Sequence, residues 1–282
     1  MPSLFLRQFR NELMKMFARK RTWIGFGAFF GLELIILFLL QTKSVQRGFR
    51  DFLEHNGAVF EEYFGGLTLA FDVMALTVVL LGALYLALVA GDIVSKEVED
   101  GTMRMTLCRP VGRGRVLVVK YLSALVYCFV LVAFIGISAF LTGLAWRGVG
   151  GLCAIVPEER LFSLFPANEG LVRYFGSLPL FALSLCTIVS MAFMFSCCNV
   201  KPAAASVTTL TIFLVDRILY FWPQFAPYKA VFMTTHMVTW VHLFRTPVPW
   251  ASMAEDYLIL LGLNVTFFIV GCTVFLRRDF KS

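Results

Sequence analysis

The chain has 282 residues, of which 59% are hydrophobic and only 15% carry a charge. An ordinary soluble domain carries about 25% charged residues, so this composition excludes a water-soluble globule. The same hydrophobicity excludes intrinsic disorder, and seven Cys, an odd number placed mostly in apolar runs, exclude a disulfide framework. The sequence therefore predicts a polytopic membrane protein.

The first predicted element, residues 3–21, is a basic amphipathic helix. Leu6, Phe9, Leu13 and Phe17 fall on one face, and Arg and Lys cover much of the rest. Such a helix lies in the membrane interface with its cations near anionic lipid headgroups. The alternative is a hydrated positive flank that only sets the topology.

Six apolar stretches follow, each near the 20 residues that a helix needs to cross the hydrocarbon. They are 22–40, 68–90, 121–145, 174–198, 202–221 and 257–276. Glu33 lies well inside the first, where a carboxylate costs about 2.5–3.5 kcal/mol on insertion scales and should face protein or water. A place on a transport pathway and a buried, hydrogen-bonded structural role both remain open for Glu33.

The basic residues set the orientation. Most of the 25 Lys and Arg precede the first span, lie between the second and third spans, or follow the last span. The positive-inside rule then predicts a multi-pass protein of the inner or plasma membrane with both termini in the cytoplasm. This arrangement explains the formal charge of +7 without nucleic acid.

The cytoplasmic segment 91–115 combines a run of acidic residues with helix-ending signals. Gly101 is a plausible end for a helix leaving the second span, and Thr102 can begin a second short helix. Pro110 and Gly112 then end that helix. The segment is predicted to form a stiff, charged bend that can pass force between a soluble partner and the membrane helices.

The outer segments are less regular. Residues 43–67 can form a short helix, and 146–173 are expected to be irregular. Residues 222–256 contain an apolar, aromatic stretch too short to span, bounded by prolines at Pro223, Pro227, Pro247 and Pro249. A re-entrant or interfacial pair of half-helices is predicted there.

Several motifs occur together in one order along the chain. They are Arg21-Thr22-Trp23-Ile24-Gly25, Glu99-Asp100-Gly101-Thr102, Arg109-Pro110-Val111-Gly112-Arg113 and Phe275-Leu276-Arg277-Arg278-Asp279-Phe280. Together with the amphipathic helix and the proline-broken outer loop, this pattern resembles the ABC-2 type permease subunits of ABC transporters. One departure is Gly112, where many members of that family have Ser.

The resemblance implies an all-α polytopic membrane protein with six transmembrane helices, an N-terminal interfacial elbow helix, a cytoplasmic coupling helix and re-entrant outer helices between spans five and six. Two permease subunits, identical or different, would pair in the lipid membrane, and each would dock an ATP-binding cassette ATPase subunit through the coupling helix. The expected docking residues are Glu97, Glu99, Asp100, Gly101, Thr102, Met103, Arg104, Leu107, Arg109 and Pro110. The alternative is that these residues only end a helix and stay hydrated.

No G-x-x-x-x-G-K-[ST] motif occurs in the chain. We therefore expect no catalytic residue and no cofactor on this subunit, with ATP and Mg on the partner ATPase. The chain is expected to be part of an exporter; the alternative is an ATP-driven membrane component that matures an outer partner, such as a copper enzyme, without moving a solute.

A copper pathway is suggested by two groups of soft ligands. Met191, Met194, Cys197 and Cys198 are expected on the cytoplasmic side, and Met233, His236, Met237 and His242 on the outer side. The two groups cannot form one site because they lie at opposite faces, so no metal site is predicted.

Overall fold

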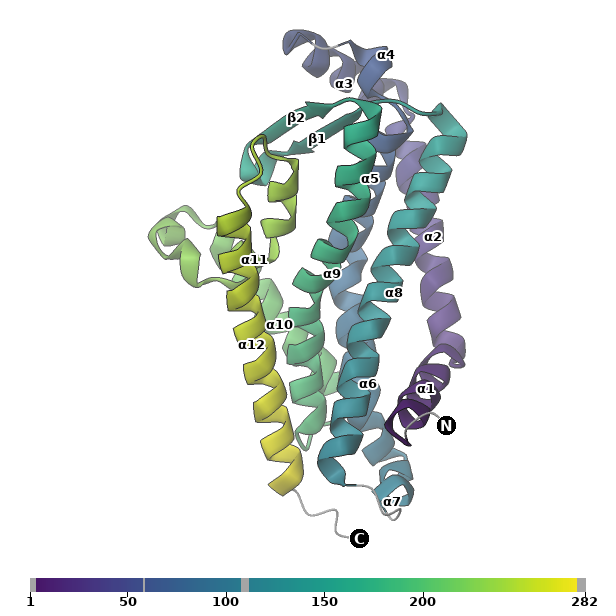
Figure 1. Ribbon diagram of the computed structural model, residues 1–282, viewed down its shortest axis with the longest axis vertical. Helices are drawn as coiled ribbons and strands as arrows, with labels where there is room; N and C mark the ends of the chain where they lie inside the picture. Colours follow the sequence, from purple (N-terminus) through teal and green to yellow (C-terminus); the bar gives the residue numbers. More distant parts are fainter. Residues whose placement is uncertain (1–3, 58, 108–111, 278–282) are drawn as a thin grey trace.

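The computed structural model describes residues 4–57, 59–107 and 112–277, which form an elongated, mostly helical bundle (Figure 1). A small hairpin crosses one end of it. The helices are α1 (Leu4–Phe17), α2 (Lys20–Leu40), α3 (Lys43–His55), α4 (Phe60–Tyr63), α5 (Gly66–Thr77), α6 (Ala83–Glu99), α7 (Thr102–Leu107), α8 (Arg113–Arg147), α9 (Ala167–Cys197), α10 (Pro202–Phe221), α11 (Met233–Met237) and α12 (Trp250–Arg277); the strands are β1 (Leu152–Val156) and β2 (Leu161–Phe165).

Five of these helices, α2, α8, α9, α10 and α12, are long and apolar enough to cross a membrane. The prediction of a mostly helical, membrane-embedded protein is therefore confirmed. The predicted stretch 68–90 is divided between α5 and α6, which a π-helical turn at Val78–Gly82 connects. Thr77 and Ala83, on either side of the turn, keep helical backbone angles, so the backbone stays helical from Gly66 to Glu99.

The apolar runs in the sequence predict where the helices lie better than they predict where each helix begins and ends. α10 matches the predicted 202–221, whereas α8 begins at Arg113 and α12 at Trp250, well before the apolar runs 121–145 and 257–276. A helix continues into its polar flanks because each further turn satisfies more backbone groups. The N-terminal amphipathic segment ends at Phe17, so α1 and α2 are separate helices.

α9 is the central helix of the bundle. In its most apolar 18-residue window 72% of the residues are buried, against 17% for α12. Its buried residues include many small polar side chains, which let neighbouring backbones approach closely. Among them are Ser177, Ser184, Thr187, Ser190 and Ser196.

These small polar groups hydrogen-bond across helices. The Ser196 hydroxyl accepts the backbone N–H groups of Val94 and Ser95 in α6, both at 3.0 Å. The Ser190 and Tyr121 hydroxyls lie 2.8 Å apart and join α9 to α8. In an apolar solvent such bonds position helices that hydrophobic packing alone would leave free to slide.

At the end of the bundle opposite α7, α5 and α8 meet through glycines. A Cβ added to Gly143 would lie 2.5 Å from the Gly66 carbonyl oxygen, and one added to Gly66 would lie 2.5 Å from the Gly148 oxygen. The Gly66 N–H donates to the Gly148 carbonyl at 3.0 Å. The two backbones are in direct contact here, which a larger residue at either glycine would prevent.

The segment expected to be irregular, 146–173, contains an antiparallel hairpin, so that prediction was wrong. β1 pairs with β2 from Leu152 opposite Phe165 to Val156 opposite Leu161. An isolated two-stranded hairpin is only marginally stable. This one gains support from outside, because the Cys153 N–H donates to the Thr68 hydroxyl of α5 at 2.8 Å, a tertiary contact that the local sequence does not reveal.

The outer segment between α10 and α12 also differs in detail from the predicted re-entrant or interfacial pair of half-helices. It consists of a 3-10 helix at Pro223–Val231, the short α11, and a second 3-10 helix at Thr239–Phe244. Pro223 and Pro227 lack the N–H that a longer α-helix needs. The first 3-10 helix projects sideways from the bundle with all its residues exposed (Figure 1).

Candidate functional site

The predicted coupling region is the bend formed by α6, α7 and α8. α6 ends at Glu99, the Asp100 N–H donates to the Lys96 carbonyl at 2.9 Å, and Gly101 has a φ of +72°. That left-handed angle suits glycine and turns the chain into α7. The bend, α1 and the end of α12 lie at one end of the bundle (Figure 1).

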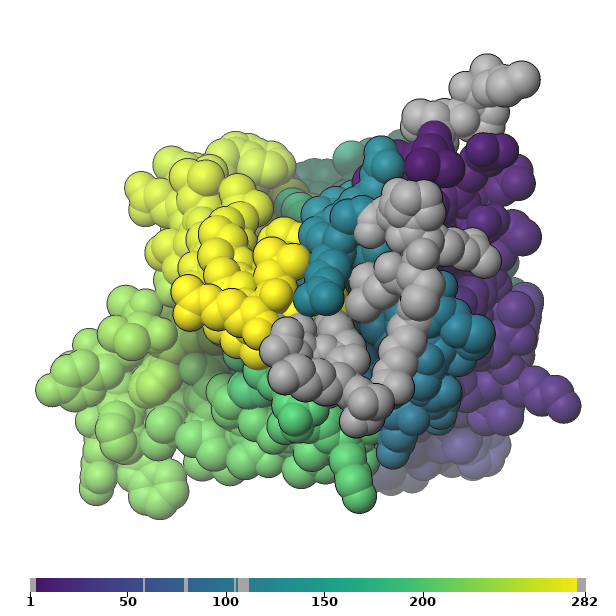
Figure 2. Space-filling model, turned by 90° about the horizontal axis from the view of Figure 1, so that it is seen from below, coloured from purple at the N-terminus to yellow at the C-terminus, as the bar shows by residue number. Residues whose placement is uncertain are grey.

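Figure 2 shows this end directly. The teal surface of α6, α7 and α8 lies between the purple N-terminal helices and the yellow end of α12. Glu99, Asp100 and Gly101 are exposed on it, and the Met105 side chain next to them is 67% exposed. We call these four residues, which run from the end of α6 into α7, the α7 face; their surface is both charged and apolar.

Other predicted docking residues lie elsewhere. Met103 is buried, and the half-buried Thr102 donates through its hydroxyl to the Glu97 carbonyl oxygen at 3.3 Å. Both therefore hold α7 against α6. Arg109 and Pro110 lie outside the described residues, as do the side chains of Arg104 and Leu107 in α7.

Glu97 is buried as well, in a cluster of four charged residues from three helices. Lys120 of α8 lies 2.9 Å from a Glu97 carboxylate oxygen and 3.2 Å from a Glu12 oxygen of α1, and Lys15 of α1 forms an ion pair with Glu97. Lys120 is fully buried and the Glu97 side chain is 4% exposed. Glu97 thus joins α1, α6 and α8 inside this chain, rather than presenting its charge to a partner.

The electrostatics of Glu97 follow from this arrangement. Burial opposes ionisation, but the ammonium groups of Lys120 and Lys15 outweigh it and hold the pKa of Glu97 below its ordinary value. A carboxyl whose pKa is lowered in the folded state contributes stability above its unfolded pKa and loses it as the pH falls through the folded pKa.

We therefore expect the melting temperature of the detergent-solubilised protein to fall on acidification below about pH 4.5. Glu97→Gln should be less stable near neutrality and should show a shallower acid decline. Thermal unfolding measured across pH for both chains tests this. Glu54→Gln, at an exposed site in α3, is the matched control and should retain the full decline. An unchanged acid slope in Glu97→Gln would contradict the assignment.

A second ion pair and an aromatic cluster attach the start of α2 to the same region. Arg21 pairs with Asp92 of α6. The rings of Phe17 and Tyr127 lie 5.4 Å apart, and the Tyr127 and Tyr85 hydroxyls are 3.0 Å apart. The N-terminal helices therefore contact both spans that carry the bend.

Glu33, the other candidate, is fully buried between helices. One carboxylate oxygen accepts a hydrogen bond from the Ser138 hydroxyl of α8 at 2.9 Å. Ser138 also lines a cavity of about 620 Å³ between α2 and α8, but Glu33 does not. This placement favours the structural interpretation of Glu33 over the pathway interpretation.

The two histidines of the outer soft-ligand group are engaged in other contacts. His236 lies between the Asp256 carboxylate, 2.7 Å from Nδ1, and the Ala230 carbonyl, 3.1 Å from Nε2. His242 lies 3.3 Å from Glu159. Among the described residues, no three His, Cys, Asp or Glu are grouped so as to hold a metal ion.

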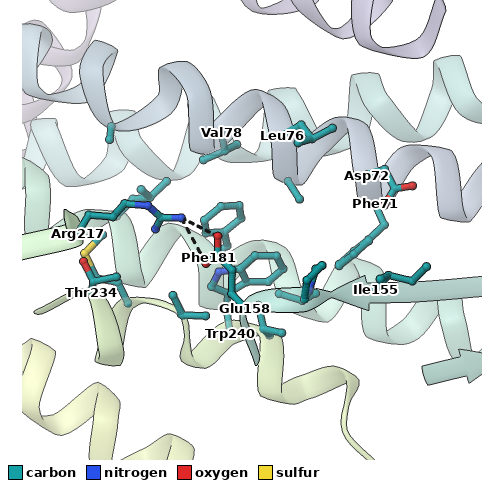
Figure 3. Close-up of a pocket in the computed structure, with 18 of the residues that line it drawn as sticks. Phe71, Asp72, Leu76, Val78, Ile155, Glu158, Phe181, Arg217, Thr234 and Trp240 are labelled. Carbon is teal, nitrogen blue, oxygen red and sulfur yellow. Dashed lines mark hydrogen bonds and ion pairs between the residues drawn. The ribbon is translucent and has the colours of Figure 1, made fainter. Parts of the chain in front are cut away.

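The sequence patterns do not predict a cavity of about 290 Å³ that is lined by residues of α5, α9, α10, the hairpin and the outer segment (Figure 3). Its walls include the aromatic rings of Phe71, Phe181 and Trp240. The residues come from five parts of the chain, so no local motif marks them.

The chain matches known sequences along nearly its whole length. The model of a family described as protein of unknown function (DUF2705) matches residues 24–281. The uncharacterized protein YhcI of Bacillus subtilis (strain 168) is 20% identical in an alignment 320 positions long, which covers 96% of this chain and 98% of the relative. The family match runs from within α2 to beyond the end of α12 and includes the bend, and the chain therefore belongs to the DUF2705 family.

Proposed function

We propose that this chain is the membrane-spanning permease subunit of an ABC transporter, an exporter in which a separate subunit hydrolyses ATP. A second permease subunit would complete the pathway. The observation that carries the proposal is the α7 face, an exposed charged and apolar surface at the bend between α6 and α8, at the end of the bundle where the basic residues concentrate. The resemblance to ABC-2 permeases supports the same function.

The proposed topology has six spans. The helical run that contains residues 68–90 would cross the membrane as the second span, beside the five helices already long enough. The positive-inside rule would then place α1, α7 and the end of α12 in the cytoplasm. The hairpin and α3 would lie outside.

The proposed mechanism uses the buried ion cluster as a rigid joint. Closure of two ATPase subunits around ATP would move the α7 face of each permease. Because Glu97 and Lys120 tie α6, α8 and α1 together, the three helices would tilt as one body and shift the interface between the two permeases.

The test is co-purification of the tagged chain from its native membrane, with bound proteins identified by mass spectrometry. An ATPase subunit that carries a P-loop is expected. Replacing Glu99 and Asp100 together by Lys should reduce its recovery at least about tenfold, because both carboxylates are exposed at the proposed contact. Glu97 is left unchanged because its replacement would disturb the fold.

The matched control is the double replacement of Asp51 and Glu54 by Lys, which makes the same charge change on the exposed surface of α3 at the opposite end of the bundle (Figure 1). It should leave recovery of the ATPase unaltered. Purification of the chain without any ATPase from several mild detergents would overturn the proposal. Equal losses of the ATPase in both double variants would show that the α7 face is not the docking surface.

A further inference from the structure

The cavity beneath the hairpin has a chemical character that points to a ligand. Its volume of about 290 Å³ is near the lower end of the range for small-molecule sites. The Phe181 and Trp240 rings are stacked, with centroids 4.3 Å apart and an interplanar angle of 15°, and Phe71 lies 6.1 Å from Trp240. Flat aromatic faces carry partial negative charge and attract cations.

The described residues that line the cavity include more acidic than basic side chains. Among the described residues that line the cavity, Arg217 is the one basic residue, and Glu158 and Asp72 are the two acidic ones. The Arg217 guanidinium is 3.2 and 3.3 Å from the two Glu158 oxygens, so these two charges neutralise each other. Within the described part of the chain, no hydrogen bond or ion pair is made by the Asp72 carboxylate.

Figure 3 shows how these groups are distributed. Arg217 and Asp72 lie on opposite sides of the drawn group, with Glu158, Phe181 and Trp240 between them. Asp72, Ala75 and Leu76 share one face of α5, so the carboxyl is carried on a rigid helix rather than on a loop. An acidic group to which the described residues offer no hydrogen bond or ion pair thus lies at one side of an aromatic cavity.

We infer that this cavity binds a small organic monocation with an apolar body, such as a quaternary or tertiary ammonium. The aromatic side chains would contact the apolar body and present their ring faces to the cationic group, and Asp72 would supply the opposite charge. An anionic ligand would face Asp72 and find Arg217 already paired. An uncharged ligand would lack the attraction between opposite charges that Asp72 offers a cation. The inference concerns binding by this chain alone and does not require an ATPase partner.

The experiment compares three probes of similar shape on the full-length chain in lipid nanodiscs. They are benzyltrimethylammonium, its uncharged carbon isostere neopentylbenzene, and benzylsulfonate. Binding is followed by tryptophan fluorescence, with empty nanodiscs as the reference for partition into lipid. Benzyltrimethylammonium should bind in a saturable manner and at least about tenfold more tightly than the other two.

Asp72→Asn keeps the size of the side chain and removes its charge, and it should weaken binding of the cation about tenfold. Asp51→Asn, at an exposed site in α3 outside the cavity, is the matched control and should bind as the unaltered chain does. Trp240→Phe should lose most of the fluorescence change, which places the probe in this cavity. Size-exclusion profiles check that each variant is folded.

The outcomes separate clearly. Equal affinity for the cation and its uncharged isostere, or undiminished binding by Asp72→Asn, would overturn the inference and leave an apolar cavity only. Tighter binding of benzylsulfonate would also overturn it and would indicate an anion site at Arg217. If Asp72→Asn does not fold, the comparison of the three probes on the unaltered chain decides by itself. Absence of an ATPase from the purified complex would leave this result unaffected, so the two proposals fail separately.

Discussion

Replacement of Lys120 by Met is expected to lower the free energy of unfolding by about 3–5 kcal/mol, the cost of removing one partner from a buried ion pair. Lys120 is fully buried and contacts both Glu97 and Glu12, so its loss leaves two carboxylates facing each other across the space that its ammonium occupied. The measurement is thermal or denaturant unfolding of the solubilised chain. Lys20→Met, at an exposed site, is the matched control and should change stability little.

A double variant tests whether the charges act as a cluster. Glu97→Gln combined with Lys120→Met should be less destabilised than the sum of the two single changes, because it removes both charges of one pair. Strict additivity would show that Lys120 and Glu97 act independently. Unaltered stability in Lys120→Met would show that the ammonium group is hydrated, contrary to its complete burial.

Gly143→Ala is expected to destabilise the bundle by about 3 kcal/mol, at the upper end of the range for overpacking. The added methyl would lie 2.5 Å from the Gly66 carbonyl oxygen, and a backbone atom cannot rotate away as a side chain can. The two helices would have to separate at the end of the bundle that supports the hairpin.

The matched control is Gly262→Ala in α12, where an added Cβ meets nothing within 4 Å. This change should be neutral or stabilise the chain by up to about 1 kcal/mol, because Ala has the higher helix propensity. The same substitution is thus expected to have opposite effects at the two positions. Unfolding measurements on both variants check this, and a neutral Gly143→Ala would show that α5 and α8 have room to move.

The sequence predicted those parts of the fold that depend on local composition. Apolar length predicted six spans, five of which are single helices long and apolar enough to cross a membrane, and the basic amphipathic pattern predicted α1. Gly101 is predictable as the turn between α6 and α7 because a left-handed backbone angle favours glycine, which the sequence itself shows. The hairpin was missed because its support comes from Thr68, far away in sequence.

The candidate site shows the same limit. Glu99 and Asp100 are exposed, as expected for residues of a charged bend. Glu97 was grouped with them because acidic residues next to one another look alike in a sequence. Its burial depends on Lys15 and Lys120, which lie 82 and 23 positions away and come into contact only when three helices assemble.

The ion cluster also sets a delay during synthesis. Glu12 and Lys120 are 108 positions apart, and a ribosome adds about 5–20 residues each second, so α1 waits about 5–20 seconds for its partner on α8. Until Lys120 is made, the carboxylate of Glu12 lacks this partner, and the ammonium of Lys15 lacks its own until Glu97 is made, 82 positions after it. The basic, amphipathic character of α1 would hold it on the bilayer surface, beside the place where α6 and α8 later emerge. The composition of α1 would thus first bind the nascent chain to the membrane surface and later supply the charged residues that pair with α6 and α8.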